Sequence, residues 1–196
     1  MAIEIKNLKG KVIHVVEGNT LMKADLHGLD LQEAHLAGMA FPQTNFQKAD
    51  LRWASLSGAR LFGTDFRGAD VRGADLEGVW TKDVNFQGAD LRASDLSGSH
   101  VEGANFKGVD FRGADLRYAR FIGANLQGAD FTGANIGEAL FNGADVRGAD
   151  FSKAKKVESA GFLGVLNADK AKGLKGVLIS RTASQLEREW GPLLRG

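Results

Sequence analysis

The feature that most constrains this chain is a large apolar side chain at every fifth position. The segment ANFKGVDFRGADLRYARF, residues 104–121, places Phe106, Phe111, Leu116 and Phe121 five residues apart. An α-helix returns side chains to one face about every 3.6 residues, and a β-strand about every two residues. A period of five fits neither element, so it indicates short extended segments that alternate with tight turns.

The repeat runs without insertion or deletion through 27 pentads, whose central residues fall at positions 21, 26, 31 and so on to 151. Twenty-six central residues are Leu, Phe, Val or Ile, and the exception is Thr81. Ala stands two residues before the centre in 17 pentads, and Asp or Asn stands directly before it in 18. Gly stands two residues after the centre in 17 pentads, so the consensus is Ala-(Asp/Asn)-(Leu/Phe)-x-Gly.

Each consensus position has a physical role in a square solenoid with four pentads per coil. The central residues would fill the axis, and the Ala would point inward near a corner where only a small side chain fits. Asp or Asn can accept hydrogen bonds from turn amides through its short side chain. Gly supplies the positive φ angle that such turns often require. The model predicts a second period of 20 residues, because pentads four apart would stack on one face.

That second period is present. On one face every residue before the centre is Asp, and we call this set the aspartate column: Asp30, Asp50, Asp70, Asp90, Asp110, Asp130 and Asp150. On another, which we call the variant face, no centre follows Asp or Asn; its centres are residues 21, 41, 61, 81, 101, 121 and 141. The other three faces together have Asp or Asn at 18 of 20 positions, so four pentads per coil is supported by the residues alone.

The segment GADLRYARFIGANLQGADFTGAN, residues 113–135, resembles the pentapeptide-repeat family, whose consensus is A-(D/N)-L-x-x. The resemblance covers residues 19–153 without interruption. It implies an all-β fold, a right-handed quadrilateral β-helix solenoid of about seven coils. An axis filled by the central residues leaves no room for an interior ligand, so we expect function to lie on the outer surface.

The two ends of such a solenoid need caps, because open strand edges invite association. Residues 1–18 predict an N-terminal β-hairpin cap. Residues 154–196 predict a C-terminal cap with degenerate pentads, a short strand at GVLIS and a short helix that begins near residues 182–184. Leu186, Trp190 and Leu193 would share an apolar stripe on that helix. In the quinolone-resistance and gyrase-inhibiting members of the family that the sequence resembles, C-terminal elements pair two rods, so a homodimer through this tail is the alternative to a simple cap.

Composition excludes several classes of protein. The chain has no cysteine, which excludes disulfides, thiolate catalysis and cysteine-based metal sites. Its formal net charge is +1, so the whole chain is neither a polyanion nor a nucleic-acid-binding polycation. We find no secretory signal and no apolar run near the roughly 18 residues of a membrane span. The default expectation is a cytoplasmic protein that binds neither membrane nor nucleic acid directly.

We find no constellation of catalytic or metal-binding residues, and predict no enzyme activity, no cofactor and no metal site. The four histidines, His14, His27, His35 and His100, do not pair at metal-ligand spacing. The aspartates recur for a structural reason, and Arg52, Arg72, Arg92 and Arg112 follow four of them two residues later. We expect these arginines to neutralise the aspartate column, although cation binding by the column remains an alternative.

The variant face is where we predict partner binding. Its centres are flanked by exposed aromatic, apolar and basic residues, which are favoured anchors at protein interfaces. The predicted contact residues are Arg60, Phe62, Trp80, Lys82, His100, Arg120 and Ile122. The alternative is that this face only uses a different turn type. The segment GVWTKDV adds a second ambiguity, because the chain could reverse there to bury Trp80 and expose Thr81.

Two functions follow for comparison. The first is a non-catalytic interaction or scaffold module that presents the variant face to an unknown protein partner. The second comes from the family resemblance: a DNA mimic that modulates a type II topoisomerase such as DNA gyrase or topoisomerase IV and gives quinolone-type protection. The residues favour the first function, because a DNA mimic should be strongly acidic. The repeats carry 18 Asp and Glu against 14 Lys and Arg, an excess of only four negative charges. The loop insertions of many quinolone-resistance members are also absent.

Overall fold

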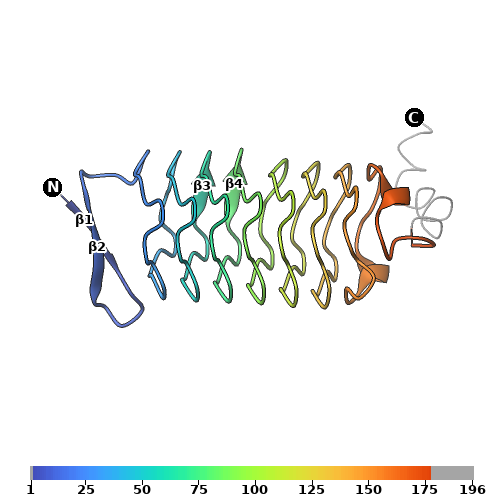
Figure 1. The fold of residues 1–196 in the computed structure, drawn as a ribbon, viewed down its shortest axis with the longest axis horizontal. Coiled ribbons are helices and arrows are strands. Elements are labelled where there is room, and N and C mark those ends of the chain that lie inside the picture. Colours follow the sequence, from blue (N-terminus) through green and yellow to red (C-terminus); the bar gives the residue numbers. More distant parts are fainter. Residues whose placement is uncertain (1, 178–196) are drawn as a thin grey trace, which may run out of the picture.

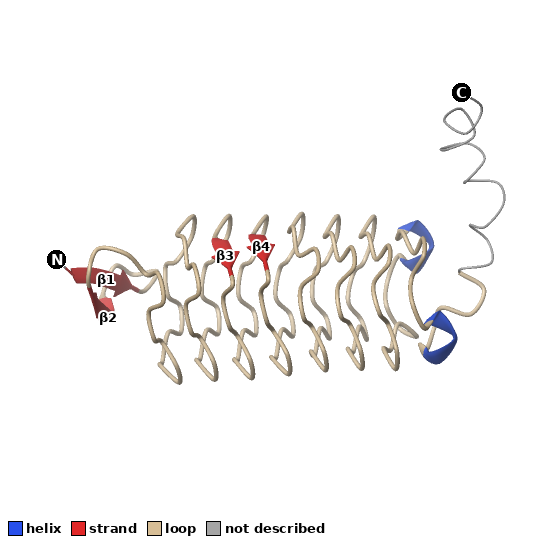
Figure 2. Ribbon diagram, turned by 90° about the horizontal axis from the view of Figure 1, so that it is seen from above, coloured by secondary structure: helices blue, strands red, loops and turns tan. Residues whose placement is uncertain are grey.

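The computed structural model describes residues 2–177, which form a rod of stacked coils (Figure 1). A β-hairpin lies at the N-terminal end of the rod, and the last described coils lie at the opposite end. Figure 2 shows the same single file of coils from a perpendicular direction. The chain is therefore an all-β solenoid, as the five-residue repeat predicted.

Residues 20 apart in the sequence lie beside one another in parallel β-bridges through most of the rod. The aspartate column is one such ladder, running from the Asp30–Asp50 bridge to the Asp130–Asp150 bridge. Backbone hydrogen bonds join the same coils; the Leu51 N–H, for example, donates to the Asp70 C=O at 2.7 Å. One coil therefore contains four pentads, and the predicted vertical file of aspartates is confirmed.

The central residues of the pentads fill the interior. From Leu21 to Phe151 every one is at most 3% exposed, with the exception of Thr81. Phenylalanines of successive coils stack face to face: the ring centroids of Phe66 and Phe86 are 4.5 Å apart, and those of Phe86 and Phe106 are 5.1 Å apart. Burial of one such side chain contributes about 1.5–3 kcal/mol before entropy is deducted, so a continuous apolar column stabilises the rod.

The corners of the coils are built as the consensus predicted. Asp50 Oδ1 accepts a hydrogen bond from the Arg52 N–H at 3.2 Å, and Asn85 Oδ1 accepts one from the Gln87 N–H at 3.0 Å. The residue after each donor turns through the left-handed region; Gly88, after Gln87, has a φ of 66°. Polar side chains therefore satisfy turn amides that the coil-to-coil bonds do not use.

Four β-strands occur among the described residues. Strands β1 (Ala2–Lys6) and β2 (Val12–Glu17) pair antiparallel in the hairpin. Strands β3 (Arg60–Phe62) and β4 (Trp80–Lys82) pair in parallel on the variant face. Elsewhere in residues 2–177 the coils meet through isolated bridges, so in the solenoid the variant face alone keeps three consecutive residues extended.

One face of the hairpin packs on the first coil. Ile5 is 1% exposed and belongs to the apolar core, and Ile3 and Val16 pack against that core. The His35 N–H also donates to the Lys6 C=O at 2.7 Å. The hairpin thus covers apolar side chains that the first coil would otherwise expose.

The coil ladder continues beyond the last regular pentad, with longer coils. Leu140 bridges Gly161, an offset of 21 residues. Two 3-10 helices, Val157–Ser159 and Ala168–Lys170, lie in the segments that lengthen these coils. Phe162 stacks on Phe141 and extends the core.

Part of the predicted C-terminal region lies outside the described residues. This applies to the expected helix, to most of the expected strand at 176–180, and to Leu186, Trp190 and Leu193. Within residues 2–177 the structure contains no α-helix. None of the described helices is long and apolar enough to span a membrane.

Candidate functional site

The variant face carries a group of exposed aromatic and basic side chains on β3 and β4. The strand register places Arg60 beside Trp80 and Phe62 beside Lys82, and all four residues are exposed. Side chains alternate along a strand, so Leu61 between the outward pair is buried. We call these four residues the β3–β4 quartet; its two aromatic residues are diagonal to each other, as are its two cations.

The structure decides between the two orientations of the segment GVWTKDV. Trp80 is 56% exposed, whereas Thr81 takes the inward position of its pentad. The chain therefore keeps the orientation of the repeat and does not reverse. The Thr81 Oγ1 is buried and has no hydrogen-bond partner in the described part of the chain, so the exposed Trp80 is accompanied by an unsatisfied hydroxyl beneath it.

Next to the quartet, contacts between side chains hold several residues of the variant face in place. The Trp80 indole stacks on the His100 imidazole, with ring centroids 4.3 Å apart and planes 11° apart. His100 Nδ1 lies 3.5 Å from Glu102 Oε1, and Arg120 Nε donates to the same oxygen at 2.5 Å. Burial raises the pKa of the Glu102 carboxyl, but the hydrogen bond from Arg120, a backbone hydrogen bond and the positive charge of Arg120 together outweigh it, so the net shift is downward. Glu102 thus stays ionised and binds Arg120, with His100 close beside it.

The seven predicted contact residues lie on one face but differ in availability. The β3–β4 quartet is exposed, whereas His100, Arg120 and Ile122 are half-buried. Arg60 and Lys82 form no ion pair with any described residue, in contrast to Arg120. The face therefore divides into an open half around β3 and β4 and a half whose polar groups are already engaged.

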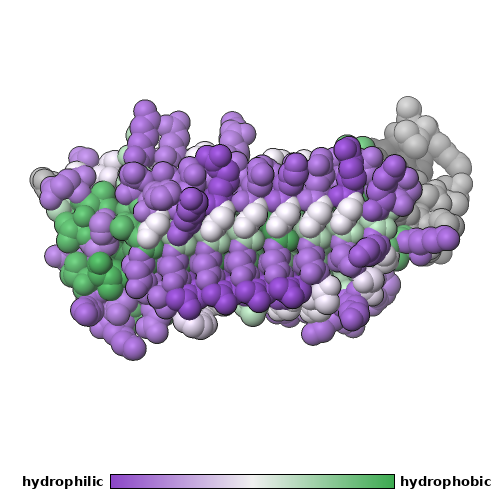
Figure 3. Space-filling view, viewed as in Figure 1, coloured by the Kyte–Doolittle hydropathy of each residue, from purple (hydrophilic) through white to green (hydrophobic). Residues whose placement is uncertain are grey.

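The aspartate column lies on another face and is neutralised by arginine. Arg72 Nε donates to Asp70 Oδ1 at 2.8 Å and lies 3.6 Å from Asp90 Oδ2 in the next coil. Arg52, Arg92 and Arg112 repeat this bridging arrangement. Rows of polar side chains along the rod are visible in Figure 3. Each carboxylate in this stretch thus meets arginine within its coil.

Neither cation binding nor acid-base chemistry is favoured by this geometry. The hydrogen bond from Arg52 is the main reason that the pKa of Asp50 lies below its usual value, so the carboxyl is not poised to exchange a proton near neutral pH. Within residues 2–177 no three His, Asp or Glu side chains gather as a possible metal site. The column is therefore a structural ladder.

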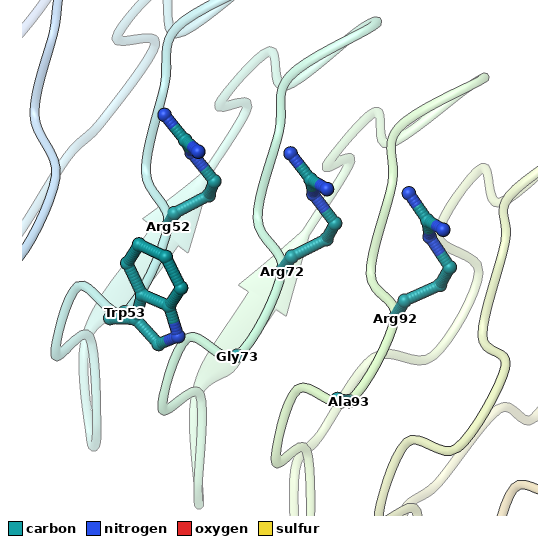
Figure 4. Close-up of a pocket in the computed structure, with 6 residues that line it drawn as sticks. All are labelled: Arg52, Trp53, Arg72, Gly73, Arg92 and Ala93. Carbon is teal, nitrogen blue, oxygen red and sulfur yellow. The ribbon is translucent and has the colours of Figure 1, made fainter.

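Sequence reasoning assigned no ligand site to a hollow on the same face. It has a volume of about 270 Å³ and is lined by Arg52, Trp53, Arg72, Gly73, Arg92 and Ala93. Figure 4 shows the three arginine side chains parallel to one another and the Trp53 indole leaning over Gly73. The sequence signal that could have indicated this hollow is Trp53, which stands at the pentad position usually occupied by Gly. The arginines are paired to aspartates, so the hollow offers little uncompensated charge to a ligand.

Comparison with known proteins identifies the repeat. A family model described as pentapeptide repeats matches eight copies, over residues 21–58, 54–78, 85–121 and 118–155. No match was found among curated proteins.

Solved structures that resemble the chain were also found. One is a trypsin-treated form of QnrB1, a plasmid-mediated fluoroquinolone resistance protein, with 23% identity over 82% of this chain and 96% of that chain and a TM-score of 0.46. Another is a pentapeptide repeat protein from the Arabidopsis thaliana thylakoid lumen, with 25% identity over 58% of this chain and 90% of that chain and a TM-score of 0.42. A third is the pentapeptide repeat protein Rfr23 from the cyanobacterium Cyanothece 51142, with 19% identity over 72% of this chain and 89% of that chain and a TM-score of 0.35.

Proposed function

The chain belongs to the pentapeptide-repeat family, and from this premise we propose that it is a non-catalytic binding module whose variant face docks a protein partner. The observation that carries the proposal is the exposed β3–β4 quartet. Trp80 is 56% exposed and Phe62 is 43% exposed on adjacent strands, whereas every other phenylalanine is buried and the exposed Trp53 and Tyr118 stand singly on other faces. Clustered exposed aromatic side chains require a reason, and a protein interface is the usual one.

The quartet has the chemistry of an interface centre. Trp and Arg are the residues most enriched where truncation weakens binding, and aromatic rings supply much contact area with few rotatable bonds. The Trp80 ring is already held by its stack on His100, so binding would cost little additional side-chain entropy. Arg60 and Lys82 lack ion-pair partners within residues 2–177 and are available to carboxylates of a partner.

The remainder of the chain supports this surface in our proposal. Residues 19–153 form a right-handed β-helix of about seven coils, which acts as a rigid platform. Residues 1–18 form the N-terminal cap, and residues 154–196 form the C-terminal cap. The packing of Ile5 on the core supports the role of the hairpin. The alternative role of Leu186, Trp190 and Leu193 in a dimer through the tail remains a prediction.

The test compares proteins captured from a lysate by the wild-type chain and by variants. In one variant Arg60, Phe62 and Trp80 are replaced by Ala, which removes exposed atoms and should leave thermal stability nearly unchanged. The matched control replaces Trp53 and Tyr118 by Gly, since both are exposed aromatic residues at the Gly position on other faces. A partner that is lost with the first variant and kept by the control supports the proposal. Retention by both variants excludes the variant face.

Modulation of a type II topoisomerase is the alternative function. A DNA mimic needs a surface of uncompensated negative charge, whereas the acids of the aspartate column are bridged by Arg52, Arg72, Arg92 and Arg112. A supercoiling assay with purified DNA gyrase, with and without a quinolone, separates the two functions. Inhibition or protection at micromolar protein that survives substitution of the quartet would favour the alternative.

A further inference from the structure

The hairpin has a second face, directed away from the rod. Ile3, Ile5 and Val16 pack toward the core, so the residues that alternate with them point outward. Val15 pairs with Glu4 across the hairpin and is 47% exposed, and Val12 is 39% exposed. The outward face of a cap is usually polar, yet here Val15 and Val12 stand on it beside their cross-strand partners Glu4 and Lys6.

Two further apolar residues near this end of the chain are also exposed. Leu8 in the hairpin turn is 54% exposed, and Met22 at the start of the first coil is 55% exposed. Four of the ten large exposed apolar residues of the described chain therefore lie in residues 2–22. Figure 3 shows apolar atoms gathered at this end of the rod, in contrast to the polar rows along its side. We call Leu8, Val12, Val15 and Met22 the N-terminal patch.

The charges around the patch fall into two groups. Lys6 pairs with Glu4 at 3.1 Å, and Lys9 lies 3.6 Å from Glu33, so these charges are compensated within one chain. Lys11 and Glu17 are also exposed, but neither forms an ion pair with a described residue. They flank opposite ends of β2: Lys11 precedes the strand and Glu17 ends it.

The charges and apolar residues of this surface are complementary to those of the same surface on a second copy of the chain. If β2 of a second chain runs antiparallel across the first, each Lys11 approaches the Glu17 of the other chain, and the two apolar surfaces meet between them. A two-fold axis near Val15 produces both contacts at once, as an isologous interface requires. Parallel strands would instead bring like charges together.

We propose that two copies of this chain associate through the outer faces of their N-terminal hairpins, with Val15 near the two-fold axis and Lys11 of each chain opposite Glu17 of the other. The outer faces point away from the rods, so the rods extend in opposite directions from the contact. This surface is independent of the variant face and lies at the opposite end of the rod from the last described coils.

The size of the patch predicts a weak dimer. A stable interface buries about 800 Å² on each partner, more than one face of a hairpin of this length can offer. We therefore expect dissociation in the micromolar range and a mass that depends on concentration. Sedimentation equilibrium of the full-length chain between about 1 and 200 μM should show the change from monomer to dimer.

Substitutions on the exposed face test the contact without entering the core. Val15→Lys places two ammonium groups near the axis and should weaken dimerisation at least tenfold, with an unchanged melting temperature. Lys11→Glu and Glu17→Lys should each weaken it, while the double substitution restores opposite charges and should recover most of the affinity. A wild-type chain that stays monomeric to 200 μM overturns the proposal. So does a dimer that is unaffected by Val15→Lys, or one that the double substitution fails to restore.

The absence of cysteine from the chain permits a direct proximity test. With Val15→Cys as the single thiol, a short bismaleimide should link two chains in proportion to the dimer present. Tyr118→Cys is the matched control, because Tyr118 is 62% exposed and lies on the side of the rod. Equal linking of the two variants would indicate random collision and would contradict the assigned interface.

Discussion

The unsatisfied hydroxyl at Thr81 offers the sharpest test of the core. Thr81 is the one central residue of the 27 pentads that is not a large apolar residue, and its buried Oγ1 finds no acceptor or donor in the described chain. Thr81→Val replaces the hydroxyl by a methyl group of nearly the same size. It therefore removes the desolvation penalty without adding volume that the core would have to accommodate.

The expected gain follows from that penalty. A buried polar group without a partner costs about 1–3 kcal/mol, and the new methyl group contributes further burial. Allowing for relaxation around the hydroxyl, we expect the free energy of unfolding to rise by about 1–2 kcal/mol. For a chain of this length each kcal/mol shifts the melting temperature by about 2–4 °C, so the variant should melt about 2–8 °C higher.

A matched substitution gives the opposite sign. Thr64 is fully buried, and its Oγ1 donates a hydrogen bond to the Phe41 C=O at 2.7 Å. Thr64→Val loses that bond and should lower the free energy of unfolding by about 1 kcal/mol. Circular dichroism and tryptophan fluorescence during heating and in urea measure both variants; Trp80 reports directly beside Thr81. The reasoning fails if Thr81→Val melts lower than the wild-type chain, or if both variants shift in the same direction.

Three further predictions concern the corner, the salt bridges and the core. Gly73→Ala should destabilise the rod, because its Cβ would lie 2.7 Å from Trp53 Cδ1 at a φ of 65°; the loss should shrink when Trp53→Gly is added, and an equal loss in both backgrounds would contradict the contact. The pKa of Asp50 is lowered mainly by its hydrogen bond from Arg52, so its contribution to stability is present at neutral pH and is lost as the pH falls below about 4 through the folded pKa. Asp50→Asn should therefore reduce stability at pH 7 more than at pH 3, measured by urea titration, and an equal effect at both pH values would rule out the linkage. Phe86→Ala should cost about 3–5 kcal/mol, because its ring is stacked between Phe66 and Phe106; a loss below 1 kcal/mol on urea unfolding would show that the column does not stabilise the rod as described.

Much of the solenoid could be predicted from the repeat. The period of five identified the inward residues, and the all-Asp column alone indicated four pentads per coil. These inferences succeed because every coil repeats the same local requirements: an apolar centre, a small inward residue, a polar turn residue and a positive φ. Departures from the repeat also located the candidate binding face at Arg60, Phe62, Trp80 and Lys82.

The details of that face could not be predicted, because they depend on contacts between coils. The residue types at GVWTKDV allow either Trp80 or Thr81 to point inward. In the structure, β3 and β4 are held in register by the coil ladder, and this places Trp80 outside on His100. The pairing of Arg120 with Glu102, which removes Arg120 from the open half of the face, likewise joins residues 18 apart in neighbouring coils.

The sequence by itself determined the fold and the direction of almost every side chain, because a strict repeat imposes the same backbone path on each pentad. Only the tertiary structure decided which outward groups are free and which are already satisfied by the next coil. The N-terminal patch illustrates the difference: Val15 and Val16 are the same residue type, and packing of the hairpin on the rod turns Val16 toward the core and leaves Val15 exposed. Exposure and pairing depend on neighbours distant in the sequence, so the local pattern does not contain them.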